Sequence, residues 1–170
     1  MKKITKQEAE KLLKKTNNSI DSINTSIKPS VFYQTTLNKK EFYSLIIGYH
    51  KNYDIITKKK WKILKSTTTL KECLTILFNK NLSFNKLSKG TPKGTYTPSW
   101  FEKCAQICQN TKPDQIGYLI TSNPNKQEKK ECPKSNFRLI DGTHRALSLI
   151  YLIETQKYPF TPLKTIHVSF

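Results

Sequence analysis

The chain has 170 residues, of which 36% are hydrophobic, and its 30 lysines and arginines against 12 acidic residues give a formal charge of +18. This length predicts a single domain, and because no apolar run reaches about 18 residues we expect no transmembrane helix. The excess of positive charge favours an anionic partner, whether a nucleotide, a nucleic acid, an anionic membrane or an acidic protein.

The first part of the chain, about residues 1–98, is predicted to be rich in helices. Capping boxes, in which a polar N-cap precedes Glu by three positions, mark helix starts at Thr5 with Glu8, Asn38 with Glu41, and Thr69 with Glu72. We expect the helix after Asn38 to bury Phe42, Leu45 and Ile46 on one face. A short basic helix is predicted from Lys58 to about Lys65, and a strand at Ser30–Gln34.

The second part, about residues 99–170, carries most of the strand signals. A helix is predicted to open at Ser99, and strands follow at Tyr118–Thr121, Phe137–Ile140 and Leu163–Phe170. The last strand alternates, with Ile166 and Val168 on one face and Thr165 and His167 on the other. Two long polar connections, 82–98 and 123–136, separate these elements. The expected fold is α+β, in one domain spanning 1–170.

The four cysteines include one pair at helical spacing. Cys104 and Cys108 stand at i and i+4, so they share one face of the predicted helix. That face suits either a zinc site completed by Cys132 or His144 or a pair of reduced, buried thiols. No CxxC pair occurs, which favours thiols and a reducing, cytoplasmic compartment.

The segment from Phe137 to Ile150 predicts a strand, a sharp turn and a buried helix that continues to Ile153. The helix would begin at the carboxyl end of a strand, where open α/β sheets bind ligands. Its amino terminus favours a phosphate, because N–H groups and the positive end of the helix dipole converge there. The alternative is an ordinary Asp-Gly turn followed by a solvated first helical turn.

Each residue of this turn suggests a role in phosphate chemistry. Gly142 lacks the Cβ that would keep an anion from the backbone, and Thr143 would cap the helix or donate its hydroxyl. His144 and Arg145 add donors, and the arginine fork suits phosphate. Asp141 would hold Mg²⁺ or orient an attacking hydroxyl.

The run Asp141-Gly142-Thr143-His144-Arg145 resembles the motif of the ParB/sulfiredoxin-like superfamily, which includes ParB-type nuclease domains, DGQHR-type proteins, free serine kinases and sulfiredoxin. The resemblance implies a small mixed sheet and an ATP or CTP site whose phosphates contact residues 142–145. It implies catalytic roles for Asp141, His144 and Arg145, with Mg²⁺ at Asp141.

The resemblance extends from Phe137 to the end of the chain, and departures limit what it carries over. Sulfiredoxin has Cys where this chain has Thr143, so sulfinic-acid repair is not expected. The Gly-Glu-Arg-Arg box of chromosome-partition CTPases is missing, and the catalytic Glu of the serine kinases has no match beyond a guess at Glu41. Phosphoryl transfer, or hydrolysis of a phosphodiester or nucleoside triphosphate, is the function that it implies.

A second candidate surface combines lysines with an aromatic residue. Lys58, Lys59, Lys60, Trp61 and Lys62 form either a nucleic-acid contact with Trp61 as a stacking platform or a solvated helix face. Two other functions therefore stay open: a non-catalytic DNA-binding module, and a delivered antibacterial toxin domain with an acidic immunity partner.

Three further side chains are weaker candidates for the site. His167 is a candidate to face Asp141, His50 is an exposed candidate for catalysis, and Tyr96 is a candidate for stacking on a base.

Overall fold

The protein is described by a computed structural model that covers residues 1–14, 29–47, 69–78, 104, 106–112, 115–155 and 158–170. Its strands are β1 (Lys2–Ile4), β2 (Val31–Leu37), β3 (Leu119–Ser122), β4 (Arg138–Asp141) and β5 (Leu163–Ser169). Its helices in these ranges include α1 (Lys6–Lys14), α2 (Lys39–Tyr43), α4 (Leu70–Phe78), α7 (Lys126–Glu131) and α8 (Thr143–Thr155), and residues 104 and 106–110 are also helical. The predicted α+β class is confirmed.

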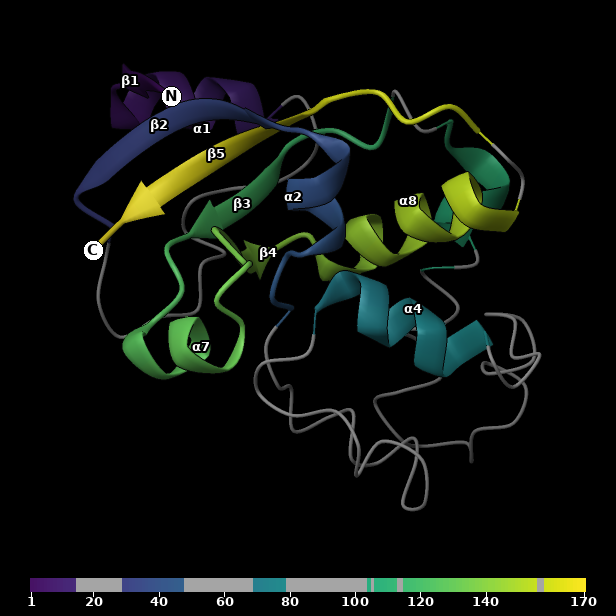
Figure 1. The fold of residues 1–170 in the computed structure, drawn as a ribbon. Helices are drawn as coiled ribbons and strands as arrows, with labels where there is room; N and C mark the ends of the chain where they lie inside the picture. The colour runs from purple at the N-terminus through teal and green to yellow at the C-terminus, as the bar shows by residue number, and fades with distance from the viewer. Residues whose placement is uncertain (15–28, 48–68, 79–103, 105, 113–114, 156–157) are drawn as a thin grey trace, which may run out of the picture.

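One sheet organises these elements (Figure 1). Its five strands have the order β1-β2-β5-β3-β4. β3 and β5 are parallel, whereas the other neighbours are antiparallel, so the sheet is mixed as expected. β2 pairs with β5 from Val31 opposite Ser169 to Leu37 opposite Leu163. The predicted helix-rich part thus supplies β1 and β2 to the same sheet that the second part completes.

β5 lies between β2 and β3 and is covered on both faces. Ile166 and Val168 are buried with α1, and Thr165 and His167 on the other face are buried too, at 0% and 2% exposure. The predicted alternation therefore gives the two faces correctly, but both faces of this central strand are buried from Thr165 to Val168, and only Lys164 near its start is exposed. A polar side chain at such a position lowers the stability of the fold unless it has a hydrogen-bond partner.

Two apolar clusters cover the two faces of the sheet. Ala9 and Leu13 of α1 pack with Ile120, Ile166 and Val168. The larger cluster joins α8 and α4, which lie beside each other in Figure 1, to Leu119, Leu139 and Leu163. No helix within the described ranges is long and apolar enough to cross a membrane.

The structure corrects two predicted elements. α2 ends at Tyr43, and the residues after it run beside β4, where Ile46 N donates to Phe137 O at 3.1 Å and Leu139 N donates to Ile46 O at 2.8 Å. Leu45 and Ile46 are buried as expected, but through strand-like pairing. The predicted polar connection 123–136 contains α7, which the capping box of Asn125 and Glu128 begins. The connection 82–98 and the basic helix at 58–65 lie outside the described residues.

Candidate functional site

The turn after β4 contains a glycine, Gly142, whose backbone conformation other residues rarely adopt. Gly142 has φ +97°, and its carbonyl accepts the first helical hydrogen bond from Ala146 N at 2.8 Å. Gly142 is therefore the N-cap of α8, and Thr143 is the first helical residue rather than the predicted cap. A glycine N-cap has no side chain to accept from the first turn of the helix.

The space beside Gly142 is filled by protein. A Cβ at this position would lie 2.7 Å from Leu119 Cδ2 and 2.8 Å from Arg145 Nη2. The predicted requirement for glycine is thus met, but for a different reason. The missing Cβ lets the arginine side chain fold across the turn, whereas we expected it to admit an anion.

Arg145 is held by two acceptors of the protein itself. Its Nη1 donates to Tyr118 O at 2.7 Å, and its Nη2 lies 3.4 Å from Asp141 Oδ2. The side chain is only 14% exposed. Burial lowers the pKa of Arg145, and the carboxylate of Asp141 opposes that effect. Arg145 therefore links the entry of β3 to the turn, in addition to any role toward a ligand.

A cleft of about 360 Å³ opens at this turn. Four motif residues line it, namely Asp141, Gly142, His144 and Arg145. Thr143, which we predicted to contact phosphate, is not among the described lining residues. The remaining wall is formed by Gln106, Ile107 and Thr111, which the sequence analysis did not identify as site residues.

Two thiols attach that wall to α8. Cys104 Sγ lies 3.8 Å from His144 O, Cys108 Sγ lies 3.7 Å from Ser148 O, and Ser148 Oγ donates to Cys104 O at 3.2 Å. Their i, i+4 spacing was therefore the signal that this helical segment packs on a partner, and the partner places Gln106 and Ile107 on the cleft.

Cys104 is a buried thiol and Cys108 is a partly buried one, and both pack against the larger apolar cluster. Burial raises the pKa of Cys104, and it raises the pKa of Cys108 to about 11. Across the described residues, no three His, Cys, Asp or Glu side chains gather as a metal site would need. The zinc alternative with Cys132 or His144 thus gains no support from this part of the chain.

Other predicted residues lie elsewhere. His167 Nδ1 is 3.3 Å from Thr121 Oγ1, and its ring packs edge-on against Phe137 at 5.4 Å, so its contacts belong to the core rather than to Asp141. Glu41 accepts from Asn38 N at 2.9 Å and caps α2. The basic cluster at Lys58, Lys59, Lys60, Trp61 and Lys62, together with His50 and Tyr96, lies outside the described residues.

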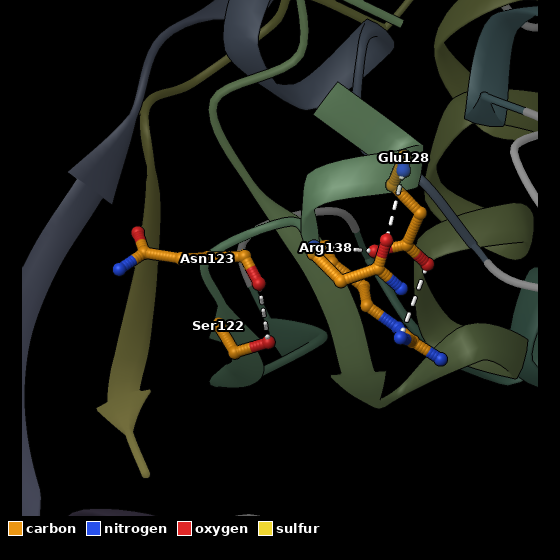
Figure 2. Close-up of polar contacts among 5 residues, drawn as sticks. Ser122, Asn123, Glu128 and Arg138 are labelled. Atoms are coloured by element: carbon orange, nitrogen blue, oxygen red, sulfur yellow. Dashed lines mark hydrogen bonds and ion pairs between the residues drawn. The ribbon is translucent and has the colours of Figure 1, made fainter. Parts of the chain in front are cut away.

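The other arginine of the chain forms an ion pair that we did not predict. Arg138 Nη1 lies 3.0 Å from Glu128 Oε1, as the dashed lines of Figure 2 show. Glu128 is buried at 3% exposure, and its second carboxylate oxygen accepts from Asn125 N at 2.9 Å. This pair ties α7 to the start of β4.

Comparison with protein-family models, curated proteins and solved structures found no match to this chain. The motif and its geometry therefore carry the functional interpretation.

Proposed function

We propose that this chain is a phosphate-binding enzyme of the ParB/sulfiredoxin-like class, which binds a nucleotide or a nucleic-acid phosphate in the cleft at residues 141–145. It would catalyse phosphoryl transfer or hydrolysis of a phosphodiester or nucleoside triphosphate. The observation that carries the proposal is the cleft itself, which has Asp141 and Arg145 on one wall at the beginning of α8. The order of β4, helix and β5 in a mixed sheet agrees with the superfamily motif.

The beginning of α8 suits an anion on electrostatic grounds. α8 has 13 residues, most of its side chains are buried, and its N-cap is a glycine without an acceptor side chain. A phosphate oxygen in the cleft at the beginning of α8 would accept hydrogen bonds from the first turn and would meet the positive end of the helix dipole. His144 lines the same wall and adds a ring that donates when protonated.

The Asp141–Arg145 pair suggests how the cleft would act. Their separation of 3.4 Å exceeds the spacing of about 2.7–2.9 Å that is typical of charge-assisted hydrogen bonds. A bound phosphate would therefore compete well for the guanidinium and stabilise charge that develops on the transferring group. Asp141 would then accept the proton of the attacking hydroxyl or water as the oxygen of that nucleophile bonds to phosphorus. The bond from phosphorus to the leaving oxygen would break, and His144 would protonate that oxygen.

A protein-only magnesium site does not fit this cleft, because Asp141 is the one carboxylate among its described lining residues. Mg²⁺ commonly binds through one or two carboxylates plus substrate phosphates, and Asp141 fits that mode. The ion would neutralise phosphate charge when bound. Asp141 would then serve as ligand rather than base, and omission of Mg²⁺ from an assay separates the two roles.

A thermal-shift panel tests the proposal. ATP, CTP, GTP and a short DNA would each be added with and without Mg²⁺, and ligand at 100 times its dissociation constant should stabilise the protein by about 2.7 kcal/mol. Asp141→Asn should keep most of the nucleotide stabilisation and lose turnover. Glu10→Gln, which removes a carboxylate on α1, is the matched control and should keep both.

A different pattern would favour the non-catalytic DNA-binding module. In that case DNA alone would stabilise the protein, its effect would fall steeply with salt, and no nucleotide would be turned over. Replacing Lys58, Lys59 and Lys60 with Gln would then weaken binding more than Asp141→Asn does. Unchanged turnover in Asp141→Asn would contradict the proposed mechanism directly.

A further inference from the structure

A second concavity lies apart from the motif cleft. It is a groove of about 730 Å³ where α2, the beginning of α4 and the end of α7 meet. We define the lysine groove by Lys39, Lys40, Lys71 and Lys134, which line it together with Tyr43 and Pro133. The groove shares no lining residue with the cleft at Asp141.

The lysines around this groove form no ion pair with any other residue that the structure describes. Within the described part of the chain, Lys40, Lys71 and Lys134 form no ion pair. Lys39 Nζ lies 5.4 Å from the centroid of the Tyr43 ring, which is a cation–π contact rather than neutralisation. The alkyl stems of these side chains, with Pro133, give the groove apolar walls under a charged rim.

The carboxylates of the groove are already engaged. Glu72 Oε2 accepts from Thr69 N at 2.8 Å and from Thr69 Oγ1 at 2.9 Å, which caps α4. Glu131 Oε1 accepts from Gln127 Nε2 at 3.0 Å. Among the described residues neither acid forms an ion pair with a groove lysine, and both remain negative wall groups that a ligand must accommodate.

We propose that the lysine groove docks an acidic peptide segment of a partner protein. Side-chain carboxylates of the segment would pair with Lys40, Lys71 and Lys134, while its backbone N–H groups would tolerate the wall carboxylates. A nucleic-acid backbone fits less well, because it lacks the N–H donors that a peptide backbone would offer to Glu72 and Glu131. Tyr43 is also not free to stack on a base, because Lys39 lies over its ring and its hydroxyl donates a hydrogen bond to Glu154.

Fluorescence anisotropy with a labelled peptide of repeated Glu-Ala-Glu-Leu, at physiological salt, tests the groove. Lys40→Gln, Lys71→Gln and Lys134→Gln together should weaken binding at least about tenfold. Lys3→Gln, Lys11→Gln and Lys14→Gln together are the matched control, since they remove equal charge from exposed positions of β1 and α1. The control should bind like the parent protein.

Each other outcome overturns the proposal. Equal weakening in both triple variants would show that net charge alone attracts the peptide. Displacement of the peptide by oligothymidylate of equal charge, with tighter binding, would assign the groove to nucleic acid, and no peptide binding would leave it without this role. Asp141→Asn should leave peptide binding unchanged, so failure here is separable from failure at the cleft.

Discussion

The two arginines of the chain lie at opposite ends of β4, and their ion pairs are built in opposite ways. At the start of the strand the acid is hidden, because the Glu128 side chain is 4% exposed while that of Arg138 is 37% exposed. Beyond the end of the strand the cation is hidden, because the Arg145 side chain is 14% exposed while that of Asp141 is 34% exposed. One end therefore buries its carboxylate, and the other presents its carboxylate to a cleft.

This inversion separates a pair with a buried acid from a pair whose acid lines a cleft. Glu128 also accepts from Asn125 N in the capping box of α7, so both of its oxygens have fixed partners. Asp141 has a longer contact with its arginine and lines the cleft, so its carboxylate is accessible from solvent. A salt bridge alone thus does not mark a candidate site, and the exposure of the acid is what distinguishes the pair at our proposed site.

The largest effect should come from breaking the pair with the buried acid. Arg138→Met leaves the buried Glu128 carboxylate without its cation and should lower the free energy of unfolding by about 3 kcal/mol in urea denaturation. Adding Glu128→Gln should restore most of that loss, since Gln also serves the third helical position of a capping box. A loss below about 1 kcal/mol would place this pair with ordinary surface pairs and break the comparison.

The second largest loss of stability should come from replacing Gly142, which follows the end of β4. Gly142→Ala forces a side chain onto φ +97° and against Leu119 Cδ2 at 2.7 Å, so we expect a loss of about 2 kcal/mol in unfolding free energy. In a double-mutant cycle with Leu119→Ala, part of this loss should vanish because the clash is relieved. Strict additivity of the two losses would show that the contact with Leu119 does not contribute to the loss.

Exchanging arginine for lysine sharpens the comparison. Arg145→Lys cannot reach Tyr118 O and Asp141 with one rigid fork, and it should cost about 1.5 kcal/mol in urea denaturation. Arg138→Lys is the matched control, because Glu128 receives a contact from one guanidinium nitrogen there. It should cost less than about 0.5 kcal/mol. Equal losses would mean that the fork of Arg145 is not used.

Local sequence signals predicted the helix starts well, since a capping box needs residues only three positions apart. Thr5 N donates to Glu8 at 2.7 Å and Asn38 N donates to Glu41 at 2.9 Å, as the spacing indicated. The burial of both faces of β5 was not predictable in this way. It depends on β2, which lies more than a hundred residues earlier, and no local pattern states which strand becomes central.

The candidate site was predicted in part for the same reason. Asp141, Gly142 and Arg145 are near one another in sequence, so their proximity in space followed from the turn. The inward direction of Arg145 did not follow, because it depends on the carbonyl of Tyr118 at the entry to β3. Gln106 and Thr111 reach the cleft only through the packing of the Cys104 segment on α8.

The smallest expected effect on stability concerns the start of β4, where His167 lies between Thr121 and Phe137. Burial lowers the pKa of His167, so the unfolded chain binds the extra proton more readily than the folded one. Stability contributed by the neutral ring is therefore present above the unfolded pKa of about 6.5 and is lost as the pH falls below it.

The loss from this residue should reach at most about 0.7 kcal/mol between neutral pH and pH 6. His167→Gln should flatten the dependence of unfolding free energy on pH in that window, while His50 and His144 stay in place as an internal control. If the slope of unfolding free energy against pH stayed unchanged, the His167 ring would be hydrated. The start of β4 would then differ less from the cleft at its end than the two ion pairs suggest.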